Sequence, residues 1–356
     1  MKLSALILTL LLGTNVAVQA AQPDEFIAAY AKQHDFNGSI LIQKQGERVF
    51  AASYGLANIP FLVRNRAGTR YKIASITKLF TSVLILQLRE QGKIDLDQPI
   101  KTYLPSYAGN GAGKVSIHQL LNHTSGLPNF DRVADAATAL RDGLPTYQTP
   151  YTSEQLVAKF CSGDLVHEPG KVFDYNNGDY ILLGKIIEQL YGASYERVLQ
   201  QSILDPLRMK DSGMLHQSDL VAGLADTYFY RDDLKALSPD LPVYPENWYA
   251  AGALYSTTDD LLAFSNALFD LKLINQASLD LLTKPGLEDY GYGVWSYQTT
   301  MNGKKHRVLK RPGRIMGAQA QLFHVFDPNV TIILLANTGT TDLDEFVAEI
   351  AKRTVD

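Results

Sequence analysis

The chain carries strand-like segments at both ends and helix-like segments between them, and this order constrains the fold most strongly. Near the start, residues 37–54 (NGSILIQKQGERVFAASY) hold two β-rich runs around a turn at 45–47, which predicts a hairpin. Near the end, Ala318–Phe326 and Val330–Ala336 have strand length, and the Asp-Pro-Asn between them is a typical turn. The sequence therefore predicts an α/β lobe built from both chain ends, with a helical region inserted into it.

Helical periodicity dominates the middle of the chain. From Ser75 to about Gln91 the apolar positions cover most of a helix circumference, which predicts a buried helix that ends at Gly92. Ile181–Tyr191 and Thr258–Leu268 show further helical patterns.

Two smaller features complete the expected fold. Ser256 and Asp259 have the spacing of a capping box for the helix near residue 258, and a last amphipathic helix is expected from about Leu343 to Lys352. We expect an α/β lobe of residues 22–75 and 286–356 and a mainly helical lobe of residues 76–285. A cleft between two lobes is a usual place for an active site, so we expect the site there.

The first residues have the pattern of a secretory signal. Lys2 supplies a positive charge, Leu3–Leu12 is apolar, and residues 18–20 (VQA) offer small side chains for cleavage. We therefore expect residues 1–21 to be a signal peptide and the protein to be secreted, either periplasmic or extracellular. The alternative is an uncleaved membrane anchor. No later run approaches spanning length, so we expect no stable membrane span after cleavage.

Composition narrows the class of protein. Apolar residues make up 46% of the 356 residues and charged residues 20%, which is typical of a globular protein. The net charge is −4 and no basic stripe is present, so we expect no nucleic-acid partner. Cys161 is the only cysteine, so it cannot form an internal disulfide, and we expect a small packed side chain.

The stretch YKIASITKLF places Ser75 and Lys78 three residues apart at the start of the expected buried helix. This spacing puts both side chains on one helix face. A serine hydroxyl needs a neighbouring base to become a nucleophile, and a lysine serves only when burial or nearby charge lowers its pKa. The serine N–H at a helix N-terminus would also favour an oxyanion. The alternative is an ordinary helix start with a surface lysine.

A second candidate element lies in residues 168–184 (EPGKVFDYNNGDYILLG), in a loop before a helix. Tyr175 could shuttle a proton between the serine and a leaving group, and Asn177 could donate to a substrate carbonyl. As an isolated tripeptide this pattern carries little information. Its value lies in its order and spacing relative to Ser75.

A third candidate element lies in residues 309–318 (LKRPGRIMGA), which open a late strand. Arg311 supplies a cation, and Gly313 allows a ligand to approach the backbone closely. Pro312 has no N–H, so the backbone N–H of Arg314 is the natural second oxyanion donor. The alternative is a basic surface turn.

Together these three elements resemble the penicillin-recognising serine hydrolases, which comprise class C β-lactamases, D-alanyl-D-alanine carboxypeptidases and related esterases. The S-x-x-K, Y-x-N and late-strand signals occur in the family order. Further matching stretches span nearly all of the chain after the expected signal: Leu120–Asn129 (LLNHTSGLPN), Ala250–Leu261 (AAGALYSTTDDL) and Tyr290–Trp295 (YGYGVW).

The resemblance implies a β-lactamase/transpeptidase-like α/β (α+β) fold, with an antiparallel sheet, flanking helices and an inserted helical lobe. It implies that Ser75 is the acylated nucleophile, that Lys78 and Tyr175 are the acid/base pair, and that Asn177 contacts substrate. It makes the backbone N–H groups of Ser75 and Arg314 the oxyanion hole. Which of Lys78 and Tyr175 holds the proton at rest stays open, since coupled groups titrate together.

One departure from the family pattern concerns substrate. The family's third motif is usually Lys or His, then Thr or Ser, then Gly, whereas this chain has Arg311-Pro312-Gly313. In family members, the hydroxyl of that Thr or Ser helps to hold the carboxylate of a β-lactam or a peptide terminus. This chain has Pro312 there and lacks the hydroxyl. Either Arg311 or Arg314 replaces it with a bidentate contact, or the substrate lacks that carboxylate. Strong β-lactamase activity is therefore less expected for this chain than the family resemblance alone would suggest.

Other catalytic patterns find no support in the sequence. No G-x-S-x-G elbow is present. Residues 109–114 (GNGAGK) resemble a phosphate loop, but the first glycine is misplaced and Val115 stands where Ser or Thr is needed. The seven histidines have no close metal-ligand spacing, and we expect structural roles for His118 and His123. We expect neither a metal nor another cofactor.

The sequence thus predicts an exported serine hydrolase that cleaves an amide or ester through a Ser75 acyl-enzyme. Its partner would be a small-molecule or peptide substrate, peptidoglycan fragments included: a D-amino-acid peptide, a small ester or a β-lactam. The alternative function is that of a non-catalytic relative that binds cell-wall fragments and regulates a response. The altered third motif is the feature that favours this alternative.

Overall fold

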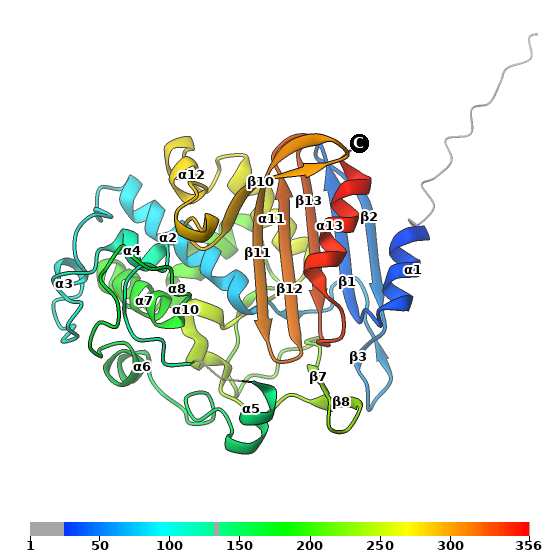
Figure 1. Ribbon diagram of the computed structural model, residues 1–356, viewed down its shortest axis with the longest axis horizontal. Coiled ribbons are helices and arrows are strands. Elements are labelled where there is room, and N and C mark those ends of the chain that lie inside the picture. The colour runs from blue at the N-terminus through cyan, green and yellow to red at the C-terminus, as the bar shows by residue number, and fades with distance from the viewer. Residues whose placement is uncertain (1–24, 132–134, 356) are drawn as a thin grey trace, which may run out of the picture.

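A six-stranded antiparallel sheet forms the centre of the α/β part (Figure 1). The structure is a computed structural model that describes residues 25–131 and 135–355, so the expected signal peptide lies outside the described residues. The strand order is β10-β11-β12-β13-β1-β2, which joins both ends of the chain through the β1–β13 pair. The strands are β1 (Gly38–Lys44), β2 (Glu47–Tyr54), β10 (Trp295–Met301), β11 (Lys304–Ile315), β12 (Ala318–Val325) and β13 (Val330–Ala336).

Both faces of this sheet are covered, which explains why the central strands β12 and β13 are buried along their whole length. Helices α1 (Glu25–Gln33) and α13 (Leu343–Thr354) pack on one face, against side chains such as Ile332 and Leu334. On the other face, Ile333 and Leu335 join the core of α2 (Thr77–Glu90) and α11 (Thr258–Phe269). Because successive strand residues point to opposite faces, a strand between two helical layers is buried at every position, so it is mostly apolar, and the buried polar pair His324 and Thr331 is hydrogen-bonded.

Helices make up most of the second part of the molecule (Figure 1). Its longest member, α7 (Asn177–Tyr191), packs against α2 and the short α10 (Tyr249–Gly252). The remaining helices are α3 (Ile100–Tyr103), α4 (Ile117–Leu121), α5 (Ala136–Asp142), α6 (Ser153–Phe160), α8 (Tyr195–Leu199), α9 (Asp205–Leu207), α12 (Gln276–Leu282) and the 3₁₀ or π segments η1 (Ala74–Ile76), η2 (Gln200–Leu204), η3 (Pro245–Trp248) and η4 (Leu287–Asp289).

Three small sheets connect these parts. A three-stranded sheet, with the order β5-β9-β6, lies next to the start of η1. Two hairpins, β3–β4 and β7–β8, project below the large sheet in Figure 1. The strands are β3 (Leu56–Asn58), β4 (Val63–Arg64), β5 (Tyr71–Lys72), β6 (Gly213–Met214), β7 (Tyr228–Arg231), β8 (Ala236–Pro239) and β9 (Leu254–Ser256).

The expected sheet, its two hairpins and the principal helices are confirmed, and one expectation is corrected. The capping box at Ser256 is wrong: the N-cap of α11 is Thr257, which accepts from the N–H of Asp260, while Ser256 hydroxyl bonds to Ser212. Residues 76–285 contain most of the helices, and one of these, α11, packs on β13 and β1. In the described part of the chain, no helix is both long and apolar enough to cross a membrane.

Candidate active site

Ser75 lies in η1 directly before α2, where the chain passes from the small sheet into the buried helix. Its side chain is half-buried, and Lys78 Nζ lies 3.2 Å from its Oγ. Lys78 is completely buried, so the alternative of an ordinary helix start with a surface lysine is wrong. The spacing of three residues places these two groups in hydrogen-bond contact, as helix geometry requires.

Lys78 has three hydrogen-bond acceptors around its Nζ. Besides Ser75 Oγ, these are Asn177 Oδ1 at 2.5 Å and the carbonyl of Ala251 at 2.9 Å. Burial lowers the pKa of Lys78, Arg311 adds to this effect, and Tyr175 opposes it. A buried lysine that meets neutral acceptors rather than a carboxylate gives up its proton more easily, which is the property a general base needs.

Tyr175 lies in the loop before α7, and its hydroxyl accepts a hydrogen bond from Arg311 Nη2 at 2.7 Å. Lys78 Nζ lies 4.7 Å from the centre of its ring. Burial would raise the pKa of Tyr175, but the cations of Arg311 and Lys78 outweigh it and lower this pKa to about 8. A phenol with this pKa exchanges protons near neutral pH, which the ordinary tyrosine does not do.

The stretch Leu120–Asn129 positions Tyr175, and no pattern within this stretch indicates that role. Asn129 Nδ2 donates to the carbonyl of Tyr175 at 2.7 Å, and the His123 ring packs 4.4 Å from the tyrosine ring. His123 Nδ1 lies 2.8 Å from Asp179 Oδ2 in the first turn of α7, with both side chains fully buried. The structural role expected for His123 is thus a contact that fixes the loop carrying Tyr175.

Asn177 is the first residue of α7 and bridges two groups. Its Oδ1 accepts from Lys78, and one of its two N–H donors is directed at Asp131 Oδ2. Asp131 also accepts from the hydroxyl of Tyr147 at 2.6 Å. Sequence reasoning missed Asp131 because nothing in its local pattern marks it. The amide of Asn177 therefore orients Lys78 and keeps one N–H for a ligand.

Arg311, on β11, is fully buried and its guanidinium is occupied by protein groups. Nε donates to the carbonyl of Ser75 at 2.7 Å, and Nη1 donates to Tyr290 and Gly293 at 2.9 and 3.1 Å. With the bond to Tyr175, this cation makes four hydrogen bonds, two of them to the candidate catalytic residues Ser75 and Tyr175. The alternative of a basic surface turn is therefore wrong, and of the two arginines it is Arg311 that points at the catalytic groups.

Gly313 lies where β11 approaches the serine most closely. A Cβ atom at this position would lie 2.2 Å from the carbonyl oxygen of Ile73 and 3.1 Å from the backbone nitrogen of Ser75. Only glycine fits such an approach. The pairing of β10 with β11 ends at Trp295 and Lys310, so the following β11 residues face the serine along an open strand edge.

A cavity of about 210 Å³ opens between these groups. Arg314 lies at its rim, where its half-exposed side chain is 3.8 Å from Asp344, and Asp344 also pairs with Lys310 at 2.9 Å. Asp344 was not foreseen, because it comes from the N-terminal turn of α13 on the other face of the sheet. The lining residues are Ser75, Tyr175, Trp295, Arg311, Pro312, Arg314 and Asp344.

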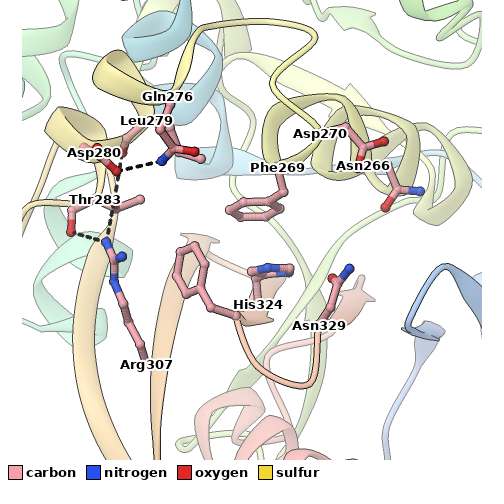
Figure 2. A pocket seen from close by; sticks show the side chains of 11 residues that line it. Asn266, Phe269, Asp270, Gln276, Leu279, Asp280, Thr283, Arg307, His324 and Asn329 are labelled. Carbon is pink, nitrogen blue, oxygen red and sulfur yellow. Dashed lines mark hydrogen bonds between the residues drawn. The ribbon is translucent and has the colours of Figure 1, made fainter.

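A second cavity, of about 250 Å³, lies between α11, α12 and the far end of β12 (Figure 2). Its floor contains His324, whose ring stacks on Phe269 at 3.6 Å and whose Nδ1 bonds to Thr331. Burial lowers the pKa of His324 to about 3, so this imidazole is neutral at physiological pH. No predicted site residue lines this cavity, and it has no nucleophile beside a base. In the described part of the chain, no cluster of His, Cys, Asp and Glu is arranged to hold a metal ion.

The fold and the site define a class. An antiparallel sheet joined to a helical part, with a serine, a lysine and a tyrosine at their junction, is the arrangement of the penicillin-recognising serine hydrolases. The family model described as Beta-lactamase matches residues 23–355, so the chain belongs to the beta-lactamase family.

Three relatives show the range of proteins that the chain resembles. It is 28% identical to the putative penicillin-binding protein PbpX of Bacillus subtilis, over 82% of this chain and 70% of that protein. It is 26% identical to the teichoic acid D-alanine hydrolase of Staphylococcus aureus, over 87% of this chain and 72% of that protein. A solved structure of a D-stereospecific amidohydrolase from Streptomyces sp. matches with a TM-score of 0.76 and 25% identity, over 92% of this chain and 98% of that one.

Proposed function

We propose that the protein is an exported serine hydrolase that cleaves an amide or ester bond through an acyl-enzyme at Ser75. One observation carries this proposal: Lys78 Nζ lies 3.2 Å from Ser75 Oγ, at a point that also faces Tyr175 across the same cavity. The lowered pKa of the lysine and the tyrosine pKa of about 8 make both groups able to exchange protons.

In the proposed reaction, Ser75 Oγ attacks the substrate carbonyl carbon, and the serine proton passes to the Lys78–Tyr175 pair. The bond from the carbonyl carbon to nitrogen or oxygen then breaks, and the pair returns the proton to the leaving group. Water attacks the resulting serine ester, which releases the acid and restores the hydroxyl. General base catalysis of this kind contributes roughly 10²–10⁴-fold.

The oxyanion hole of the proposed reaction consists of the backbone N–H groups of Ser75 and Arg314. The close approach of Gly313 to the Ser75 nitrogen supports it, because this approach brings β11 to the position such a donor needs. Gly313→Ala should lower kcat roughly 10²–10³-fold, the usual loss for an oxyanion donor. Gly113→Ala is the matched control, since an added Cβ there meets nothing within 4 Å. Equal activities of the two variants would contradict the assignment.

We propose an ester or amide of a D-amino acid as the substrate class, in preference to a β-lactam or a peptide with a free carboxylate. Two features support this choice. Pro312 removes the hydroxyl that family members use for the carboxylate, and protein groups already accept from four of the five N–H donors of Arg311, which leaves this cation no pair of donors for a bidentate contact with a carboxylate. The relatives named for D-alanine and for D-stereospecific amide hydrolysis fit the same choice.

A labelling experiment tests the nucleophile. The folded protein is treated with a fluorophosphonate and, separately, with a β-lactam probe, and its intact mass is measured. We expect the mass of one adduct in the wild type and none in Ser75→Ala. A folded wild type that no such probe labels would contradict the proposal. The mass of the secreted chain also reports whether residues 1–21 have been removed.

A substrate panel then separates the possible activities. A D-amino acid amide, p-nitrophenyl butyrate, a D-Ala-D-Ala peptide and nitrocefin are compared by kcat/KM. We expect the amide or the ester to be hydrolysed fastest and nitrocefin slowest. Preference for the D-Ala-D-Ala peptide would make the protein a carboxypeptidase and would show that Arg314 takes the carboxylate. Tight binding of cell-wall fragments without turnover of any substrate would favour the non-catalytic, regulatory alternative.

A further inference from the structure

The tip of the β3–β4 hairpin exposes three consecutive apolar side chains. Phe61, Leu62 and Val63 are 81%, 73% and 51% exposed. Single exposed apolar residues are common and need no explanation. A run of three at one tip is different, because it exposes apolar area to water without any folding benefit and is usually retained for binding.

Hydrogen bonds hold the hairpin turn in place. The backbone conformation therefore keeps the apolar side chains pointing outward. Asn58 Oδ1 accepts from the N–H of Phe61 at 2.7 Å, and the N–H of Leu62 donates to Ile59 at 3.1 Å. The base of the turn is fixed to β7, because the N–H of Ile59 donates to the hydroxyl of Tyr228 at 3.0 Å. Leu62 has a φ of +55°, a conformation that leucine rarely adopts.

A second apolar surface adjoins this tip. The β7–β8 hairpin, which lies beside the β3–β4 hairpin at the lower edge of the molecule in Figure 1, exposes Tyr230, Leu234 and Leu237 by 43%, 57% and 38%. Between the two hairpins and the end of α1 lies a largely apolar groove of about 570 Å³, whose walls include Ile59 and Leu237. The exposed apolar area therefore continues beyond the tip.

Cations stand directly behind the apolar tip. Arg64 and Arg66 are exposed, and the structure records no hydrogen-bond or ion-pair partner for either guanidinium among the described residues. On the neighbouring hairpin, Asp233 and Asp232 are paired with Arg231 and Lys235. An apolar tip followed by unpaired arginines complements a partner that has a negatively charged outer layer and an apolar layer beneath it.

We propose that the β3–β4 tip, Phe61 to Arg66, binds the surface of an anionic lipid bilayer. The three apolar side chains enter the boundary between headgroups and acyl chains, and the two arginines contact lipid phosphates. The convex shape of a hairpin tip suits insertion between lipids, whereas a protein partner needs a broad complementary face of about 800 Å². The enzyme would thus be a peripheral membrane protein with its own docking element.

Vesicle co-sedimentation of the secreted full chain tests this proposal. The vesicles contain phosphatidylcholine either alone or with 30% phosphatidylglycerol. We expect the wild type to sediment with the anionic vesicles and to be released by salt. Phe61→Ser/Leu62→Ser should weaken binding by about tenfold or more for each side chain, and each of Arg64→Gln and Arg66→Gln by about fivefold.

The matched control is Leu220→Ser/Leu287→Ser, which removes two exposed leucines elsewhere on the surface. It should bind vesicles like the wild type, and all variants should keep their near-UV circular dichroism. Failure of the wild type to bind either vesicle would overturn the proposal. The proposal would also be overturned if Phe61→Ser/Leu62→Ser bound anionic vesicles as well as the wild type does. A third contradicting result is a wild type that does not bind lipid but forms a dimer that these two substitutions dissociate.

Discussion

Two buried groups of ionisable side chains lie side by side in this molecule. In one group the surroundings favour a charged form, and in the other they favour the neutral forms. In the catalytic group, Tyr175 has its pKa lowered to about 8 although burial opposes this shift. In the neighbouring His123–Asp179 pair, burial lowers the pKa of the histidine and raises that of the acid, so burial favours the neutral form of both side chains. Burial is common to both, so it does not decide the outcome.

The difference comes from the presence of a fixed cation. Arg311 donates directly to the Tyr175 hydroxyl, and an arginine does not lose its proton in a protein, so it favours the tyrosine anion. The His123–Asp179 pair has no such partner, and Lys78 and Arg311 nearby further disfavour a charged His123. The geometry is consistent with this: the N–H of Asn176 points at His123 Nδ1 at 3.3 Å, and a ring nitrogen that accepts from it leaves the proton of the 2.8 Å contact to the Asp179 carboxyl.

The largest expected effect comes from removing the lysine of the catalytic group. Lys78→Met should lower kcat by roughly 10²–10⁴-fold, because the Lys78–Tyr175 pair then loses the member whose nitrogen lies 3.2 Å from Ser75 Oγ. Lys72→Met is the control: burial also lowers the pKa of Lys72, but its Nζ donates to Thr227. Steady-state kinetics with the best substrate of the panel would measure both. A similar loss in the two variants would mean that general disruption, and not base removal, explains the effect.

A smaller effect should follow from removing the cation, and it should show mainly in the pH profile. Wild-type kcat/KM should rise through a limb near pH 8 if the Tyr175 anion takes part. In Arg311→Met this limb should move toward pH 10, the ordinary pKa of tyrosine, with roughly 100-fold less anion at neutral pH. The control Arg314→Met should keep the limb near pH 8. A limb that stays near pH 8 in Arg311→Met would show that Arg311 does not set the tyrosine pKa.

The contrast also shows what the sequence could and could not predict. Spacing along one helix is a local property, so Ser75 and Lys78 were predictable as neighbours, as were the strands from their apolar runs. The bond from Arg311 to the carbonyl of Ser75 joins residues 236 positions apart, and no local pattern encodes it. Even the cap of α11 was misplaced by one residue, because consecutive hydroxyl residues before a helix compete for the same role.

Asp131 and Asp344 are two residues near the site that sequence reasoning did not find. Asp131 reaches Asn177 from a loop, and Asp344 reaches Arg314 from a helix that packs on the opposite face of the sheet. Neither residue has a neighbour in sequence that indicates its function, since each acquires it only through tertiary packing. The site residues that sequence reasoning found are those whose partners are close in the chain or belong to a family pattern.

The smallest expected effect concerns the neutral pair and should appear only in stability. Between about pH 4 and 6.5, the unfolded chain carries one proton on His123 and the folded chain carries one on Asp179, so the pair adds no pH dependence. Where the pH is above the ordinary pKa of histidine, 6.5, and still below the raised pKa of Asp179, the unfolded histidine has lost its proton while the folded carboxyl keeps its own. The folded state then binds more protons, and stability should fall as pH rises.

Asp179→Asn removes this proton while keeping the shape of the side chain. The difference in unfolding free energy between wild type and variant should therefore shift in favour of the variant between pH 6.5 and 9, by up to about 1.4 kcal/mol per pH unit over the range in which the folded Asp179 keeps its proton. Urea unfolding at both pH values measures it, and Asp233→Asn, at a fully exposed position, should show no such shift. A wild type that gains on the variant with rising pH would mean that Asp179 is an anion paired with a charged histidine. The fixed cation would then not be what separates the two groups.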